Sequence, residues 1–347
     1  MLENPVSRLR VAGCGLYTIA ATYQTRKGVH IMKRFKNILF VYDDEKVSGV
    51  ALKRAVTLAR ENGAALTVVE AIEEFPPETG MAIQSSRIGD FQETIERESR
   101  QGLKQLIEPI KETGIQVKGK VLWGKPFLEI IREVLRNNHD LVMISPLKKP
   151  RLNEILFGSR TMHLLRKCPC PVWVIIPSQP KRYSRILAAV DAAPLNDAKA
   201  SLNFQIMELA TSLAHMEKSE MHIVHCWKPF FDRPIRGGRS LLKEGDAKKL
   251  VNEARNTNKR WVSELVGKFD LKDLTHKVHI LEGDAEELIP RMASKRQVEL
   301  VVMGTVCRTG LPGFFIGNTA EKILHKLECS VLAIKPVGFQ TPVKLDD

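Results

Sequence analysis

Residues 299–304 read Glu-Leu-Val-Val-Met-Gly, and residues 140–145 read Asp-Leu-Val-Met-Ile-Ser. The two stretches are 159 positions apart in a chain of 347 residues. Three further pairs of residues have the same separation: Gly124 and Gly283, Gly158 and Gly317, and Cys170 and Cys329. Repeated matches at one offset indicate an internal duplication, and the length of the chain suits two domains.

Each half alternates short apolar runs with longer segments of helical periodicity. The runs are rich in Val, Ile and Leu, which is typical of strands buried on both faces of a parallel sheet. Strands are therefore predicted at 36–43, 65–72, 115–122, 140–145 and 171–177, and again at 184–191, 220–227, 276–281, 298–304 and 330–335. The fold class is α/β, with two tandem doubly wound domains, each built on a five-stranded, mostly parallel sheet.

The expected division of the chain is an N-terminal extension at 1–31, a first domain at 32–178, a second domain at 183–336 and a C-terminal tail at 337–347. Met32 stands just before the first predicted strand, so residues 1–31 are interpreted as a disordered extension or a start upstream of the natural one. The last strand of each half is apolar and would otherwise be an exposed edge. We expect these two strands to pair and to join the halves as a pseudo-dimer.

The net charge of +13 arises from 53 Lys and Arg beside 40 Asp and Glu, mixed along the chain. Such mixing favours a basic but interspersed surface over a dedicated nucleic-acid groove. None of the six cysteines has the spacing of a structural zinc site, and together they are read as reduced thiols in the cytoplasm. No apolar run is long enough to span a bilayer.

The segment from Val302 to Glu321 combines a strand end at Gly304, a glycine-rich loop and a helix beginning near Asn318. This order of elements can cradle phosphate, because glycine allows close backbone approach and a helix N-terminus offers unpaired N–H groups. The alternative is that Gly317 and Asn318 only cap the helix.

From residue 32 to about residue 336 the chain resembles the universal stress protein family in its tandem, two-domain (E-type) form, whose domains are adenine nucleotide alpha hydrolase-like. The family signature is a glycine, two residues, a glycine, nine residues, then glycine with serine or threonine. The second half matches this spacing with Gly304, Cys307, Gly317 and Asn318-Thr319, and the first half with Ser145, Lys148 and Gly158-Ser159.

Both halves depart from the signature at the second glycine. A Cβ atom at Lys148 or Cys307 would crowd backbone that approaches phosphate, if that position needs a positive φ. The side-chain charges of Lys148 and Arg308 can offset part of this loss. Because the second half keeps its first glycine, it is the better candidate for a site.

The resemblance implies ATP as the ligand and a set of residues that hold it. A carboxylate at the end of a strand, as at Asp43 and Asp191, can accept a hydrogen bond from a ribose hydroxyl; the alternative is that the aspartate forms a turn. By the same resemblance Val224 and Met303 would flank the base; the alternative is that they are ordinary core residues. The implied cofactor-binding residues are Asp191, Val224, Met303, Gly304, Cys307, Arg308, Gly317, Asn318 and Thr319, with Asp43, Gly158 and Ser159 in the first half.

No catalytic motif is present: the chain has neither a Gly-x-Ser-x-Gly elbow nor a complete P-loop. His222 and His225 are expected on opposite faces of one strand, which argues against a shared metal. The predicted function is that of a cytoplasmic, non-catalytic stress-response protein that binds a nucleotide or other phosphate-containing ligand, mainly in its second domain.

Three alternatives remain from the sequence: a weak ATPase or nucleotide switch, an RNA-binding or partner-binding module, and a carrier of a phosphorylated amphiphile. The carrier would use an apolar cluster at Leu311, Phe314, Phe315 and Ile316, which equally suits packing of a helix on a sheet. The expected partners are the small ligand, the other half of the same chain and a second copy in a homodimer, with nucleic acid less favoured.

Overall fold

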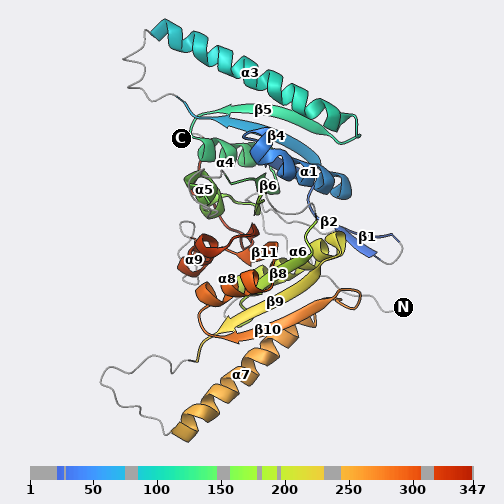
Figure 1. The fold of residues 1–347 in the computed structure, drawn as a ribbon, viewed down its shortest axis with the longest axis vertical. Helices are drawn as coiled ribbons and strands as arrows, with labels where there is room; N and C mark the ends of the chain where they lie inside the picture. Colours follow the sequence, from blue (N-terminus) through green and yellow to red (C-terminus); the bar gives the residue numbers. More distant parts are fainter. Residues whose placement is uncertain are drawn as a thin grey trace, which may run out of the picture.

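The computed structural model describes residues 22–26, 29–74, 85–146, 157–177, 182–193, 197–229, 244–305 and 316–345. Cys307 and Arg308, the loop residue Lys148 and the apolar residues Leu311, Phe314 and Phe315 lie outside this described part. Figure 1 shows two α/β halves joined at the middle of the molecule, with the long helices α3 (Ser85–Lys111) and α7 (Glu244–Val266) at its two ends.

The first half alternates strands and helices in the predicted order. Its elements are β3 (Asn37–Val41), α1 (Glu45–Asn62), β4 (Ala65–Ile72), α3 (Ser85–Lys111), β5 (Val117–Trp123), α4 (Pro126–Asn137), β6 (Leu141–Ile144), α5 (Ser159–Lys167) and β7 (Val172–Val174).

The second half repeats this order. Its elements are β8 (Arg185–Val190), α6 (Asp197–Glu217), β9 (Glu220–Trp227), α7 (Glu244–Val266), β10 (His276–Glu282), α8 (Ala285–Lys295), β11 (Leu300–Gly304), α9 (Asn318–Lys326) and β12 (Ser330–Ile334). All ten strands predicted from the apolar runs are therefore present.

The repeated glycines 124 and 283 have one conformational role in both halves. Gly124 lies between β5 and α4 and Gly283 between β10 and α8, with φ of 129° and 138° respectively. Residues other than glycine rarely adopt this backbone conformation. An added Cβ would also lie 3.0 Å from Glu129 at the first position and 3.0 Å from Leu288 at the second. This shared turn explains why the duplication preserves glycine there.

The ten strands form one continuous sheet in the order β10-β9-β8-β11-β12-β7-β6-β3-β4-β5. Pairing is parallel within each half, whereas β7 and β12 pair antiparallel, with Trp173 opposite Leu332. The expected pairing of the last strands is confirmed. Because that pair is antiparallel, the strands of the two halves run in opposite directions, and their carboxyl ends lie at opposite edges of the sheet.

Helices cover both faces of the sheet, so that two apolar cores form. One core packs the sheet against α1, α3, α6 and α7, and the other packs it against α4, α5, α8 and α9. Helices on both faces of the sheet are the doubly wound arrangement that the apolar runs predict. Both cores also run from the first half into the second.

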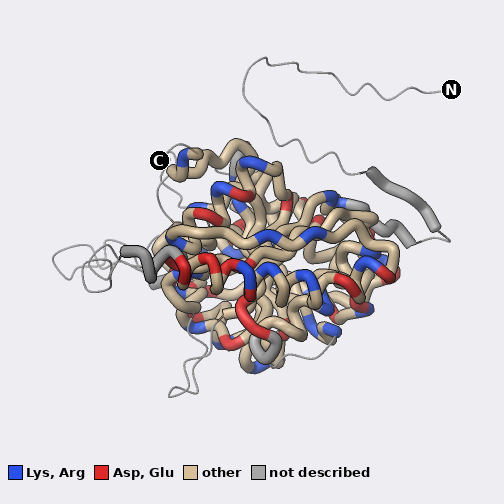
Figure 2. Tube along the Cα trace, turned by 90° about the horizontal axis from the view of Figure 1, so that it is seen from above, with Lys and Arg blue, Asp and Glu red and all other residues tan. Residues whose placement is uncertain are grey.

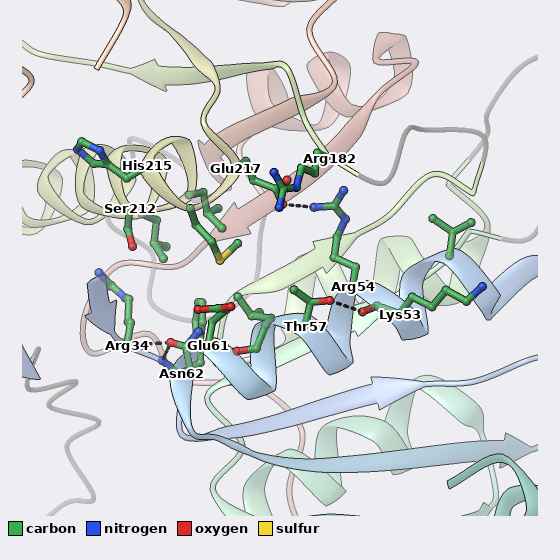
Figure 3. Close-up of a pocket in the computed structure, with 16 residues that line it drawn as sticks. Arg34, Lys53, Arg54, Thr57, Glu61, Asn62, Arg182, Ser212, His215 and Glu217 are labelled. Atoms are coloured by element: carbon green, nitrogen blue, oxygen red, sulfur yellow. Dashed lines mark hydrogen bonds and ion pairs between the residues drawn. The ribbon is translucent and has the colours of Figure 1, made fainter. Parts of the chain in front are cut away.

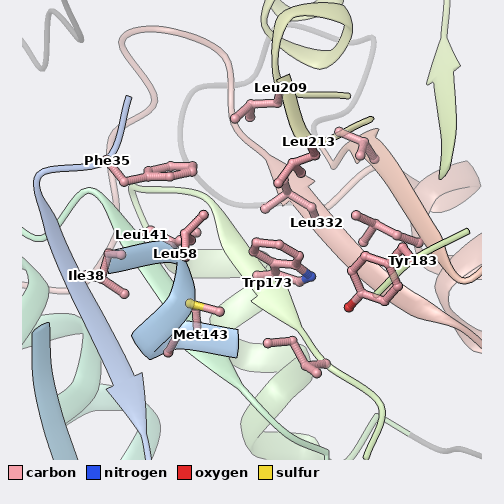
Figure 4. Packing of buried hydrophobic residues seen from close by; sticks show 14 of the residues in the cluster. Phe35, Ile38, Leu58, Leu141, Met143, Trp173, Tyr183, Leu209, Leu213 and Leu332 are labelled. Atoms are coloured by element: carbon pink, nitrogen blue, oxygen red, sulfur yellow. The ribbon is translucent and has the colours of Figure 1, made fainter. Parts of the chain in front are cut away.

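The seam between the halves is filled by large side chains (Figure 4). Trp173 and Tyr183 are fully buried, with ring centroids 6.2 Å apart. The guanidinium of Arg54, on α1, lies 3.7 Å from the Tyr183 ring centroid and pairs with Glu217 of α6. A cation held over a buried ring and bonded to a carboxylate ties the first half to the second.

Outside the large sheet, β1 (Thr22–Arg26) and β2 (Val29–Lys33) form an antiparallel hairpin within and just beyond the segment assigned to the extension. Among the described residues, no helix has the length and apolar character needed to cross a bilayer. Basic and acidic residues are interspersed over the described part of the chain, and the view of Figure 2 shows no continuous basic stripe.

Shortening Leu332 to alanine should test the dependence of the fold on the seam. The fully buried side chain lies on β12 in the core shared by both halves, so Leu332→Ala should lower the free energy of unfolding by about 2–5 kcal/mol in urea titrations. The same change at the 42 % exposed Leu345 is the control and should cost less than about 1 kcal/mol. Equal effects of the two substitutions would contradict a shared core at the seam.

Candidate functional site

The two predicted aspartates stand at matching places, each just beyond the first strand of its half. The backbone N–H of Asp43 donates to Ser48 Oγ at 3.1 Å, and that of Asp191 donates to Asn203 Oδ1 at 3.0 Å. Asn203 Nδ2 also donates to the Asp191 carbonyl at 2.7 Å. The following helix therefore holds the backbone of each aspartate, which leaves the carboxylate to meet other groups.

Each carboxylate has a cationic partner, and the two partners come from different elements. Asp43 pairs with Arg160, the second residue of α5, whereas Asp191 pairs with Lys199 of α6 at 2.6 Å. In the first half the ion pair therefore joins the end of the strand to the N-terminus of the helix that would hold phosphate. In the second half the cation belongs to a different helix.

The N-terminal turns of α5 and α9 have the features of an anion site. Their N-caps are Gly158 and Gly317, and neither has a side-chain hydrogen bond to the first turn. Gly317 N donates to Thr305 O at 3.1 Å, which fixes the start of α9 beside the end of β11. Asn318 and Thr319 are exposed in this turn, and the first N–H groups of a helix have no partner within the helix, which is the feature that anion sites use.

Val224 and Met303 lie on the strands that flank β8, and both are buried in the core on the α8 and α9 face. Their contact with a base stays a prediction. Gly304 has a packing role: an added Cβ would lie 2.6 Å from Leu202 Cδ2 on α6. The first glycine of the second half therefore leaves room for Leu202, and a larger residue there would displace that side chain whether or not phosphate binds.

Lys335 is a residue that sequence reasoning missed. It follows the apolar strand β12 and precedes a proline. This sequence context is typical of an exposed lysine, yet Lys335 is only 5 % exposed. Its Nζ atom donates to the Leu165 carbonyl of α5 and to Thr305 Oγ1, both at 2.7 Å. The amine thus links the last turn of a first-half helix to the residue that opens the loop of the second half.

Burial lowers the pKa of Lys335 to about 7, although the nearby Cys168 acts in the opposite direction. The matching position in the first half is Ile176, which has no charge. Lys335 is therefore a difference between the two loops that the repeat pattern conceals. Because burial disfavours the ammonium form, the contribution of this amine to the free energy of unfolding depends on pH.

The histidines of β9 lie on opposite faces of the sheet, as expected. His225 Nε2 lies 2.7 Å from Asn258 Oδ1 on α7, beneath the end of β8. His222 Nδ1 lies 3.0 Å from Nε2 of His279 on the neighbouring β10, and burial lowers the pKa of both imidazoles. Within the described part, no three side chains of His, Cys, Asp or Glu are grouped to hold a metal.

Among the described residues, the first-half edge has a second carboxyl group near its aspartate. Glu70 of β4 lies near Asp43, and burial, followed by repulsion from Asp43, raises the pKa of Glu70 despite a hydrogen bond from Ser99. Because Asp43 is paired with Arg160 and Glu70 lies beside it, an anionic ligand at this edge would meet an ion pair and a second carboxyl group. The second-half edge has His225 and Cys226 on the strand that corresponds to β4.

Comparisons with known proteins cover both halves. A sequence model of the universal stress protein family matches residues 34–175 and 182–335. Universal stress protein E of Salmonella typhi is 31% identical over 318 residues, which are 91% of this chain and 99% of that protein. Universal stress protein E of Escherichia coli K12 is 30% identical over the same length, with the same shares of both chains.

Solved structures show the same tandem arrangement. A universal stress protein of Pseudomonas aeruginosa UCBPP-PA14 is 27% identical, with a TM-score of 0.64 over 88% of this chain and 94% of that one. A universal stress protein of Archaeoglobus fulgidus has a TM-score of 0.60 at 17% identity, over 86% of this chain and 98% of that one. The latter likeness concerns the fold alone.

Replacing Lys335 with methionine should change how stability depends on pH. The lysine pKa is 10.5 in its ordinary state and about 7 in the folded protein, so between these values the unfolded chain binds more protons. The stability of the wild type should therefore rise with pH relative to Lys335→Met, by up to about 1.4 kcal/mol per pH unit.

Urea titrations at pH 7, 8.5 and 10 measure this difference. Lys344→Met, at an exposed lysine, is the control and should follow the wild type. If the curves of the wild type and Lys335→Met stay parallel from pH 7 to pH 10, Lys335 is not a buried, depressed amine.

Proposed function

The chain belongs to the universal stress protein family, and we propose that it is a cytoplasmic stress-response protein that binds a nucleotide or other phosphate-containing ligand in its second half without turning it over. ATP is the first ligand to test. The observation that supports this most is that three groups lie at one edge of the second half: the start of α9 at Gly317, Thr305 just after β11, and Asp191 just after the adjacent β8.

The two ends of such a ligand have different requirements. Polyphosphate is stabilised by the N–H groups and the dipole of the α9 N-terminus. A ribose hydroxyl needs an acceptor, and Asp191 is 32% exposed at the end of a strand that directly neighbours β11. The ammonium group of its partner Lys199, whose side chain is 14% exposed, would supply a positive charge to a phosphate bound beside Asp191.

The second half is preferred over the first for an electrostatic reason. In the first half, Arg160 bonds the aspartate across the start of α5, and Glu70 adds a second carboxyl group nearby. A phosphate entering there would have to displace the guanidinium and approach two acids. In the second half the corresponding strand carries His225 in place of Glu70.

Binding without turnover is proposed because the sequence has no catalytic motif. Hydrolysis requires an activated nucleophile or a metal-held water. Among the described residues of this edge, no serine or cysteine is hydrogen-bonded to a histidine. The described cysteines, Cys168, Cys170, Cys226 and Cys329, are free thiols, which agrees with a reducing compartment.

A matched pair of glycine substitutions tests both the ligand and its place. Gly317→Val puts a branched side chain at the α9 N-cap, and Gly158→Val makes the same change at the α5 N-cap; both glycines have negative φ, so the backbone tolerates valine. Calorimetric titration with ATP and Mg²⁺ should show at least about tenfold weaker binding for Gly317→Val and wild-type binding for Gly158→Val.

Native mass spectrometry of the same proteins reports any nucleotide retained through purification, and a phosphate-release assay reports turnover. Loss of binding only in Gly158→Val would assign the ligand to the first half. Steady release of phosphate by the wild type would identify a weak ATPase in place of a binding protein.

A further inference from the structure

A cavity of about 480 Å³ lies on the seam between the halves, apart from both strand edges. Its walls are α1 from the first half and α6 from the second, as Figure 3 shows. None of the residues predicted for the nucleotide site lines it. The volume is within the range of small-molecule sites in proteins, roughly 300–1,000 Å³.

The body of the cavity is apolar. Four of its six large apolar residues are almost completely buried: Phe35, Leu58, Leu209 and Leu213. The other two are the half-buried Val50 and Met216. An occupant that fills this space gains most from aliphatic surface, because burial of apolar area is worth about 25 cal/mol per Å².

The charges on the lining favour an anion. The lining carries four cations, Arg34, Lys53, Arg54 and Arg182, against the two acids Glu61 and Glu217. Arg54 is neutralised by Glu217, and Arg34 by Glu208 outside the lining.

Lys53 and Arg182 are both exposed, and the described part of the chain gives neither of them an ion pair. They are the cations that a ligand can engage at low cost, because a head group between them stays hydrated.

The two ends of the cavity differ in charge. In Figure 3, Glu61 and Asn62 lie with Arg34 at one end, and Lys53 lies with Arg54 toward the other. An anionic head group is repelled from the Glu61 end and attracted to the end that holds Lys53. The apolar tail then runs along the floor between the helices.

Polyphosphate does not suit this cavity. Asn62 is the last residue of α1 and Glu217 is the last residue of α6, so both helices bring their C-terminal ends to the walls. Helix C-termini carry partial negative charge, which disfavours a multiply charged anion. A single carboxylate avoids most of this repulsion.

We propose that this cavity binds a long-chain carboxylate, with its head group between Lys53 and Arg182 and its alkyl chain between α1 and α6. The site requires both halves, because α1 of the first half and α6 of the second each contribute one wall. It is separate from the nucleotide edge and does not depend on nucleotide binding.

Calorimetric titration of the full chain with dodecanoate, below its micellar concentration, tests the proposal. Dodecanoate should bind, and dodecan-1-ol, with the same chain and no charge, should bind at least about threefold more weakly, since an exposed ion pair contributes up to about 1 kcal/mol. Absence of dodecanoate binding would overturn the proposal, and equal binding of the alcohol would overturn the assignment of a carboxylate.

Two variants place the ligand. Ser212→Trp puts a bulky ring into the cavity from a half-buried position of α6, and it should weaken dodecanoate binding at least about tenfold. Its control is Ser263→Trp at an exposed serine of α7. The double variant Lys53→Gln/Arg182→Gln changes exposed residues only and should weaken binding about three- to tenfold, with Lys104→Gln on α3 as its control.

Circular dichroism melts show whether each variant is folded, and the double variant keeps the test valid if Ser212→Trp unfolds. Wild-type dodecanoate affinity in a folded Ser212→Trp protein, or in the double variant, would overturn the assigned cavity. ATP titrations of the same variants should match the wild type, which separates a failure at this site from a failure at the nucleotide edge.

Discussion

The antiparallel pairing of β7 with β12 is the contact on which the rest of the molecule depends. Each half ends on an apolar strand whose free edge would be open to association with other chains. Joining the two edges makes one sheet of ten strands and extends both apolar cores across the seam. Trp173 and Leu332, which face each other in this pair, are both fully buried.

The same pairing determines where the two candidate phosphate sites lie. Because the halves run in opposite directions, their candidate phosphate sites lie at opposite edges of the sheet, while α5 and α9 meet near the seam. Arg166 of α5 pairs there with Glu321 of α9, and Lys335 reaches from β12 to the end of α5. Lys335 therefore connects Thr305, just after β11, to a helix of the first half, and Ile176 at the matching position of the first half has no amine to make such a link.

Duplication followed by divergence leaves two sites of different character. In the first half, Arg160 and Glu70 occupy the surroundings of Asp43, and in the second, Lys199 and His225 occupy those of Asp191. Between the halves, α1 and α6 approach closely enough for Arg54 to bond Glu217 and still enclose a cavity. One chain thus combines a candidate phosphate site at an edge of the sheet with a largely apolar cavity at the seam.

The apolar runs and the offset of 159 residues predicted all ten central strands, the duplication and the strand pair that joins the halves, since buried parallel strands leave a pattern that depends on local sequence. The sequence also placed Asp43, Asp191, Gly158 and Gly317 at strand ends and helix starts. The partners of these residues were beyond its reach. Arg160, Lys199, Leu202 and Lys335 are brought to the sites from other elements, and only packing decides which side chain arrives. A lysine after an apolar strand reads as exposed, but the antiparallel seam covers Lys335 with the neighbouring half, so that its burial, its hydrogen bonds and its lowered pKa are properties of the tertiary structure alone.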